Sequence, residues 1–299
     1  MQKEVSSKTV RERVRRAAIL PARYGFGAAR LGRRIEQMVA FMDRWEFRPT
    51  IPVTASVLDR HPSVVRSLRG ADLAIHGYHH RSYASMDTKQ QAADLDAAIS
   101  AFGRRGLVAE GFRAPYLAPG PATFRLLRSR RFVYDSSIPE FYLTDREPIS
   151  DRAKKLAVMR YGRLTPVSSR KNDGSIMTEL PVALPDDEIL VDGLGIRSPS
   201  TLTRILRVMT DRALASARHL VLQVHPERFH IFAGALDSVL EKATEDGAWK
   251  TSLSDAAAWM VSGKSQPGNW PNGGPYAVSV TGDLDALSLS DFATRVLVT

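Results

Sequence analysis

Hydrophobic positions recur along this chain with two different periods. In residues 31–47 (LGRRIEQMVAFMDRWEF) they are three or four apart, which predicts an amphipathic helix. Helical spacing returns at 61–68, 88–104, 121–130, 200–217 and 232–245. The remaining apolar or β-branched runs are short and predict strands: PTIPVTASV (49–57), DLAIHGY, EGFRAPY, FVYDSS, TELPVAL, HLVLQVHP and WKTSLSD.

The alternation of strands and helices predicts an α/β fold with a largely parallel sheet. About seven such units favour a closed or nearly closed (β/α) barrel over an open doubly wound sheet. Polar side chains lie at or just beyond the carboxyl ends of four of the runs: His76, Arg113, Asp135 and His225. Because barrels of this kind keep their active sites at that edge, these four residues are the first candidates for a site.

The last part of the chain departs from this pattern. Residues 262–275 are rich in Gly, Pro, Asn and Ser, which predicts a linker. The run YAVSVTG that follows alternates like one more strand and leads into Asp283 and Asp285. We therefore expect four segments: a basic arm (1–30), a barrel (31–261), the linker (262–275), and a C-terminal strand and helix (276–299).

Composition limits the chemistry that this chain can perform. Its 299 residues are enough for a single barrel domain. The absence of cysteine excludes disulfides, thiolate metal sites and cysteine nucleophiles, so any metal must be bound by His, Asp or Glu. No run approaches the roughly 18 apolar residues that span a bilayer, and we expect a cytoplasmic location.

The formal net charge of +10 is concentrated at the N-terminus, where residues 1–34 hold ten Lys and Arg against only Glu4 and Glu12. One explanation is a solvated helix face. The other is peripheral contact with an anionic membrane or a lipid phosphate at the inner membrane face. Nucleic acid is not an expected partner, because no RRM, KH or helix-turn-helix pattern accompanies the charge.

The segment HGYHH places His76 and His80 four residues apart. On a helix this spacing would resemble half of a zincin site, but Gly77 stands where that site needs a glutamate. Because DLAI before it predicts a strand, the two histidines are expected to leave a strand end, where two imidazoles can converge on one metal ion. A surface or packing role is the alternative.

Four motifs, HGYHHRSY, GFRAPYL, VYDSS and LVLQVHPER, occur in this order along the chain. Together they resemble the polysaccharide deacetylase family, also called the NodB-homology group or carbohydrate esterase family 4. The resemblance covers about residues 48–260. It implies a distorted (β/α) barrel that hydrolyses N-acetyl or related groups with a divalent metal held by one Asp and two His.

One family motif is missing from its usual place. The family opens with a strand that ends in paired aspartates, yet residues 1–30 contain no aspartate and Asp43 lies within a predicted helix. The C-terminal run YAVSVTGDLDA fits the missing motif. We therefore expect a circularly permuted arrangement, in which the C-terminal strand lies beside residues 49–57 in the first barrel position. An acidic turn on an edge strand is the alternative.

The resemblance then assigns the metal to Asp285, His76 and His80. Zn²⁺ is the first expectation for this ligand set, with Co²⁺ or Ni²⁺ as alternatives. Asp283 would be the general base, and Arg113 would pair with its carboxylate.

Three further roles follow from the same resemblance. The backbone N–H of Tyr116 would stabilise the tetrahedral oxyanion. His225 would protonate the leaving amine, unless it is a packed core histidine. Asp135 would orient His225 or Arg113, or else cap a helix or turn. Weaker candidates for the substrate wall are His79, Tyr83, Asp186, Asp187 and Trp249.

The leading hypothesis is a metal-dependent hydrolase that acts on non-peptide carbon–nitrogen bonds and removes an acetyl group from an N-acylated amino sugar of a glycan or glycan precursor. A second hypothesis is hydrolysis of a non-sugar linear or cyclic amide. The third is a catalytically inactive saccharide-binding barrel, which predicts that Asp283 and Asp285 lie far from His76 and His80.

Overall fold

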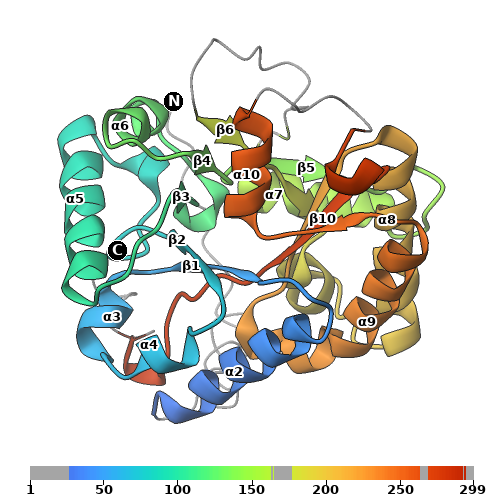
Figure 1. Cartoon of the computed structure of the whole chain (residues 1–299), viewed down its shortest axis with the longest axis horizontal. Helices are drawn as coiled ribbons and strands as arrows, with labels where there is room; N and C mark the ends of the chain where they lie inside the picture. The colour runs from blue at the N-terminus through green and yellow to red at the C-terminus, as the bar shows by residue number, and fades with distance from the viewer. Residues whose placement is uncertain (1–26, 163, 165–176, 263–268, 292, 294–299) are drawn as a thin grey trace.

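The computed structural model describes residues 27–162, 164, 177–262, 269–291 and 293. The helices in these residues are α2 (Ala29–Asp43), α3 (Ser56–Arg60), α4 (Val64–Ser67), α5 (Thr88–Arg104), α6 (Thr123–Ser129), α7 (Ser150–Tyr161), α8 (Pro199–Ser216), α9 (Phe229–Glu245) and α10 (Leu253–Val261) (Figure 1). The strands are β1 (Thr50–Val53), β2 (Asp72–Ile75), β3 (Gly111–Phe112), β4 (Tyr134–Asp135), β5 (Pro139–Phe141), β6 (Thr178–Glu179), β7 (Val182–Leu184), β8 (His219–Gln223), β9 (Trp249–Lys250) and β10 (Ala277–Thr281).

Two helices show how the sequence pattern becomes local structure. Helix α2 buries a stripe at three- and four-residue spacing that includes Leu31, Ile35 and Met38, and it ends four residues before the predicted limit. Helix α5 spans the predicted residues 88–104. It begins at a capping box, in which the Asp87 carboxylate accepts from the Gln90 backbone N–H and the Gln90 side chain accepts from the Asp87 N–H.

The strands form one parallel sheet, in the order β5-β7-β8-β10-β1-β2-β3-β4-β6, with β9 paired to the start of β10. Ten strands are described, against about seven expected. Eight runs were predicted to be strands, including WKTSLSD, which contains β9, and the other two strands arise because β5 was not predicted and one predicted strand is divided. The α/β class and the distorted (β/α) barrel predicted from the sequence are confirmed.

The divided strand is TELPVAL. Its first part, β6, pairs with β4, whereas its second part, β7, pairs with β8 near the other end of the strand order. Pro181 lies between the two parts and has no backbone N–H to donate to a ladder, which favours a break at this point. Because only two residues separate β6 from β7, the two ends of the strand order must lie close together, which brings the sheet near to closure as a barrel.

The C-terminal strand β10 lies inside the sheet, between β8 and β1 (Figure 1). It is paired with β8 over its whole length, from Ala277 opposite His219 to Thr281 opposite Gln223. Gly282 follows, and a Cβ there would lie 2.5 Å from the Val224 carbonyl oxygen, so the close approach of the two strand ends requires glycine.

Pairing with β1 continues beyond the end of β10. Leu284 forms an isolated parallel bridge with Val53. Its N–H donates to the Pro52 carbonyl at 2.8 Å, and its carbonyl accepts from the Thr54 N–H at 3.1 Å. The two aspartates on either side of Leu284 are thereby held at the carboxyl edge of the sheet.

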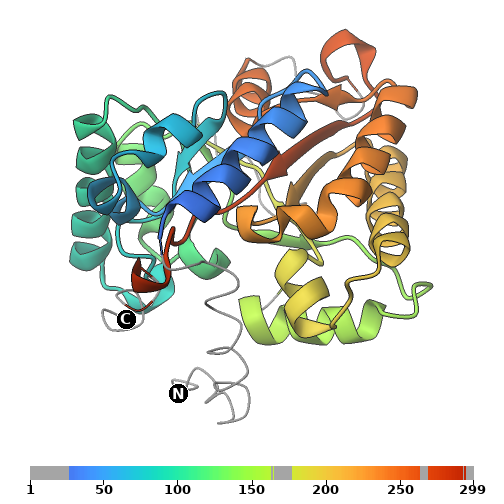
Figure 2. The ribbon, with the colours of Figure 1, turned by 90° about the horizontal axis from the view of Figure 1, so that it is seen from below.

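Two hydrophobic clusters pack around the central strands. One joins side chains of α2, α8 and α9 to β8 and β10, and the other joins α3 and α5 to β1 and β2. Figure 2 shows α2 crossing the molecule between the group formed by α3, α4 and α5 and the group formed by α8 and α9. The core thus lies around the strands that carry the candidate residues.

Some predictions concern residues that the structure describes only in part. The basic arm (1–30) lies almost entirely outside the described residues, and six residues of the linker (263–268) are also outside them. None of the helices in the described ranges has both the length and the apolar character needed to cross a membrane.

A buried histidine lies in the core away from these candidates. His219 begins β8, and its Nε2 faces the Ser279 hydroxyl at 2.8 Å. Because that hydroxyl donates to the Thr251 carbonyl, Nε2 must donate to Ser279. Burial lowers the pKa of His219 to about 3, so the imidazole is neutral in the folded protein at neutral pH.

This lowered pKa predicts a loss of stability in acid. The unfolded chain protonates His219 below about pH 6.5, whereas the folded protein does so only near pH 3. The stabilising contribution is therefore present above pH 6.5 and is lost as the pH falls toward 3. Between pH 7 and pH 5 the free energy of unfolding should fall by about 2 kcal/mol more in the wild type than in His219→Gln. Denaturant unfolding of both proteins at the two pH values measures this, and equal pH dependence would contradict it.

Candidate metal centre and active site

The two histidines lie on the loop that follows β2. Gly77 and His80 both have positive φ, 68° and 56°, which turns the chain sharply between the imidazoles. Asp94 on α5 supports the turn, because its carboxylate accepts from the Tyr78 N–H at 2.8 Å and from the Tyr83 hydroxyl at 2.9 Å. Both imidazoles are buried as a result.

His76 is oriented by the neighbouring strand. Its Nδ1 donates to the Arg113 carbonyl oxygen at 2.8 Å, which leaves Nε2 unprotonated and directed at the site when the ring is neutral. A hydrogen bond from the other ring nitrogen to a backbone carbonyl is the usual arrangement around a metal-binding histidine.

Asp285 completes a set of three groups that could hold a metal ion. Its Oδ1 lies 3.0 Å from His80 Nε2 and 3.4 Å from His76 Nε2. The three ligand atoms all lie within 4.8 Å of one another. Ligands about 2.0–2.2 Å from a tetrahedral zinc ion are separated by roughly 3.3–3.6 Å, so donor types and spacing fit such an ion.

Asp283 lies beside this set and is held by two side chains. Arg113 Nη1 donates to its Oδ1 at 2.7 Å, and Gln223 Nε2 donates to its Oδ2 at 3.0 Å. The same oxygen, Oδ2, lies 3.7 Å from His76 Nε2 and faces the ligands. Asp283 is therefore a fixed carboxylate at the edge of the metal position.

Arg113 is fully buried and joins three strand ends. Besides Asp283, its guanidinium donates to the Thr281 hydroxyl at 2.9 Å, to the Ser136 carbonyl at 3.0 Å and to the Ser136 hydroxyl at 2.8 Å. These bonds satisfy a charge that would otherwise be costly to bury. They also fix the direction of the nitrogen that contacts Asp283.

His225 lies two residues after Gln223, the last residue of β8, and is paired with Asp187. Its Nδ1 lies 2.8 Å from Asp187 Oδ1, and its backbone N–H donates to Oδ2 at 2.9 Å. Burial lowers the pKa of His225, but the Asp187 carboxylate more than offsets this, so the pKa lies well above its ordinary value. The ring carries a proton at neutral pH and can donate it.

This pair corrects the expectation for the partner of His225. The carboxylate that bonds His225 is Asp187, which the sequence offered only as a weak substrate-wall candidate in PDDE. Asp135 accepts from the Ser137 hydroxyl at 2.7 Å and the Ser137 N–H at 3.1 Å, a turn arrangement like the stated alternative. A Pro-Asp-Asp turn after a strand was the one available signal, and it does not distinguish a catalytic carboxylate from a turn residue.

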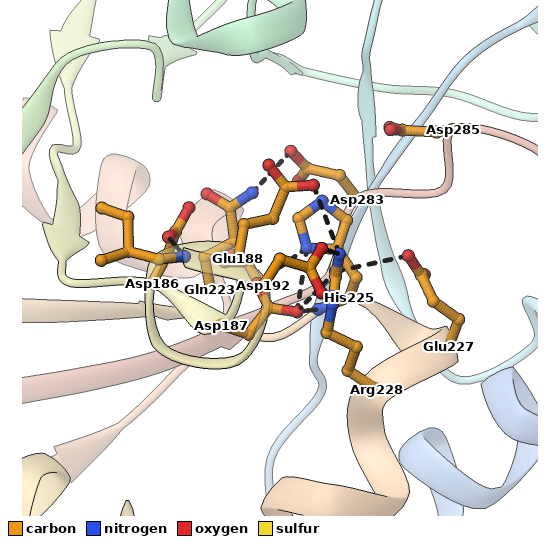
Figure 3. Close-up of polar contacts among 12 residues, drawn as sticks. Asp186, Asp187, Glu188, Asp192, Gln223, His225, Glu227, Arg228, Asp283 and Asp285 are labelled. Atoms are coloured by element: carbon orange, nitrogen blue, oxygen red, sulfur yellow. Dashed lines mark hydrogen bonds and ion pairs between the residues drawn. The ribbon is translucent and has the colours of Figure 1, made fainter. Parts of the chain in front are cut away.

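Asp187 also belongs to a buried cluster of charged side chains around Arg228. Arg228 Nη1 donates to Asp187 at 3.0 Å, and Arg228 Nη2 donates to Asp192 at 2.7 Å (Figure 3). Burial raises the pKa of Asp187, and His225 and Arg228 outweigh it, so the net pKa is lowered and the carboxylate stays ionised. Glu188 and Glu227 also contact Arg228.

Tyr116 lies on the other side of the ligand set. Its ring meets the His80 imidazole edge to face with centroids 4.6 Å apart, and 42% of the residue is exposed. Its φ is 62°, so the backbone is in the left-handed region next to the candidate metal ligands. The residue is well placed at the mouth of the site.

The weaker candidates are scattered. Tyr83 is buried under the histidine loop and bonds Asp94. Asp186 is buried beside Asp187, bonds the Tyr161 hydroxyl and caps the turn at Ile189. Trp249 belongs to β9, which pairs with the first residues of β10, so it lies toward the opposite end of β10 from Asp283 and Asp285.

Several solved structures have a fold similar to that of this chain. Among solved structures, one assigned as a polysaccharide deacetylase from Mycobacterium smegmatis aligns with a TM-score of 0.60 at 23% identity, covering 87% of this chain and 86% of that chain. A second polysaccharide deacetylase assignment, from Pseudomonas aeruginosa PAO1, gives 0.56 at 18% identity over 80% and 77%. An allantoinase, Puue, gives 0.54 at 19% identity over 80% and 75%.

Sequence similarity to a curated protein covers a much shorter part of the chain than the structural alignments do. A peptidoglycan deacetylase-like protein of Gibberella zeae is 39% identical over 73 residues, which are 23% of this chain and 21% of that protein. The match thus spans about a fifth of the curated relative's length. No family model matches the chain. The chain has the polysaccharide deacetylase fold, and the resemblance indicated by its motifs is confirmed at that level.

Proposed function

We propose that this protein is a metal-dependent hydrolase that removes an acetyl or similar acyl group from the nitrogen of an amino sugar in a glycan or glycan precursor. The observation that carries the proposal is the position of Asp285, whose Oδ1 is 3.0 Å from His80 Nε2 and 3.4 Å from His76 Nε2. The saccharide-binding alternative required these groups to be far apart. A divalent ion, with Zn²⁺ the best match to the ligands, is part of the proposal.

A bound ion at this position would act as a Lewis acid that polarises the acyl carbonyl and acidifies water. Asp283, held by Arg113 and Gln223, is placed to accept the proton that water loses as its oxygen bonds to the carbonyl carbon. His225, protonated and backed by Asp187, would donate a proton to the amine nitrogen as the C–N bond breaks. The products are a carboxylic acid and a free amine. Before the C–N bond breaks, the backbone N–H of Tyr116 would stabilise the tetrahedral oxyanion.

The order of the elements is also part of the proposal. We infer that the chain is circularly permuted relative to deacetylases that begin with the aspartate-bearing strand. In support, β10 comes last among the described strands, yet it lies between β8 and β1 and leads into Asp283 and Asp285. The domain limits expected from the sequence, 31–261 and 276–299, remain predictions.

A second candidate activity is hydrolysis of a non-sugar cyclic amide, which the alignment with an allantoinase favours. A direct test compares substrates on the full chain loaded with Zn²⁺. Acetate release from chitooligosaccharides or N-acetylglucosamine-containing peptidoglycan fragments would support the deacylase. Ring opening of allantoin without acetate release would support the amide alternative, and no turnover of any of these substrates despite bound zinc would contradict both.

We further propose that the basic segment 1–34 contacts an anionic membrane or a lipid phosphate. Its ten Lys and Arg support this proposal. Co-sedimentation with anionic vesicles before and after deletion of residues 1–30 tests it, and unchanged vesicle binding would remove it.

A further inference from the structure

A buried carboxylate, Asp291, helps to attach the segment that follows Asp285 to the rest of the protein. Asp291 is 1% exposed. Its Oδ2 accepts from the backbone N–H groups of Leu287 at 2.9 Å and Ser288 at 3.1 Å. These bonds close residues 287–291 into a compact turn.

The same carboxylate is bound to a different part of the chain. Arg60 Nε lies 2.9 Å from Asp291 Oδ1, and His61 Nε2 lies 2.9 Å from Oδ2 and 3.0 Å from Oδ1. Both residues stand at the end of α3, which begins three residues after β1. Asp291 therefore ties the C-terminal segment to the element that β1 leads into.

Asp285 lies between two attachments to that part of the molecule. On one side Leu284 is hydrogen-bonded through its backbone to Pro52 and Thr54. On the other side Leu287 is fully buried in the cluster around α3 and α5, and the Asp291 contacts follow. The histidine loop has its own support in Asp94, so the ligand from the C-terminal segment depends on these two attachments.

We infer that Asp291, with Arg60 and His61, is a positioning group that holds Asp285 at the metal site. This role rests on the proposed metal-dependent function. None of the described residues after Asp285 lies in a strand that could fix it, and the contacts of Asp291 with Arg60 and His61 at the end of α3 take that part. Partners that orient metal ligands typically change metal affinity by about 10- to 100-fold.

The test measures zinc affinity directly, by competition with a chromophoric chelator, on the full chain. Asp291→Asn is expected to weaken zinc binding by about tenfold, and kcat should return toward the wild-type value at saturating zinc.

Asp72→Asn is the matched control. Asp72 is also a buried carboxylate with three hydrogen bonds, to Thr50 Oγ1 at 2.8 Å, Ser254 Oγ at 2.6 Å and Ser254 N at 3.2 Å, but it begins β2 at the opposite edge of the sheet. The Asp72→Asn substitution should lower the thermal stability of the protein without changing its zinc affinity.

The outcomes separate the inference from the function beneath it. Zinc affinity that is unchanged in Asp291→Asn, or equally reduced in Asp72→Asn, would overturn the positioning role while leaving the metal site intact. A wild type that binds no zinc would overturn the metal site and the positioning role together. If Asp291→Asn does not fold, the double variant Arg60→Met/His61→Ala decides, because it removes both donors on α3 and retains the turn; wild-type zinc affinity there would refute the inference.

Discussion

Asp285→Ala is expected to abolish both zinc binding and deacylation, the largest effect of any single substitution in this protein. Changes to groups that merely orient metal ligands cost about 10- to 100-fold in affinity, so removal of a ligand should weaken zinc binding by more than about a hundredfold. The two histidines would remain, 4.9 Å apart between ring centroids, but two imidazoles without a carboxylate make an incomplete catalytic site. Elemental analysis of zinc per chain and acetate release from the same samples measure both effects.

A suitable control for Asp285→Ala is Asp237→Ala. Asp237 is on α9 and accepts a hydrogen bond from Trp45 Nε1 at 3.1 Å, far from the ligand set in the fold. This variant should keep its zinc and its activity. Full zinc occupancy in Asp285→Ala would refute the assignment of the C-terminal strand to the metal site.

The second large effect is expected at His225. His225→Gln keeps a polar side chain but removes the proton donor, and loss of a positioned general acid typically lowers kcat by about 10²- to 10⁴-fold. Zinc affinity should not change, because the ligand set does not include His225. This separates the acid role from a packing role, since a packed core histidine would alter thermal stability rather than kcat.

Asp187→Asn tests the same role through pH. The Asp187 carboxylate raises the pKa of His225 against the opposing effect of burial. The acid form of His225 is the active one, so removing the negative charge should move the alkaline fall in kcat to lower pH. Asp192→Asn is the matched control, because it removes another carboxylate that accepts from Arg228, at 2.7 Å, and leaves the hydrogen bond between Asp187 and His225 in place. An identical shift in both variants would mean that the Arg228 cluster, rather than the Asp187–His225 pair, sets the profile.

The arrangement explains why the site is built on strand ends. Asp283 is bonded by Gln223 at the end of β8 and by Arg113, which follows β3. Arg113 is bonded in turn to Thr281 at the end of β10 and to Ser136 after β4, and each of these strands is held by parallel pairing to its neighbours. Catalytic groups on such a frame are held by backbone hydrogen bonds rather than by flexible loops alone. The histidine loop and the segment after Leu284 are the two exceptions, and each has its own buried carboxylate, Asp94 and Asp291.

Much of this was available in the sequence. The period of the apolar positions predicted α2 and α5 closely, because both helices bury one regular face. Polar residues after apolar runs predicted that His76 and Arg113 would lie close together at the carboxyl edge, since parallel strands bring their ends together. The lack of cysteine left His, Asp and Glu as the metal ligands.

The tertiary structure alone decided the rest. Helix α7 escaped prediction because its buried side chains are few and small, Ala153 and Ala157 among them, and leave little apolar periodicity. The family resemblance predicted that the C-terminal strand lies beside residues 49–57, but only the structure shows how closely Asp285 approaches His80, because this depends on a pairing between residues more than 200 positions apart that no local pattern encodes. The choice of Asp187 over Asp135 as the partner of His225 likewise depended on how separate strands pack, because short polar turns look alike in sequence.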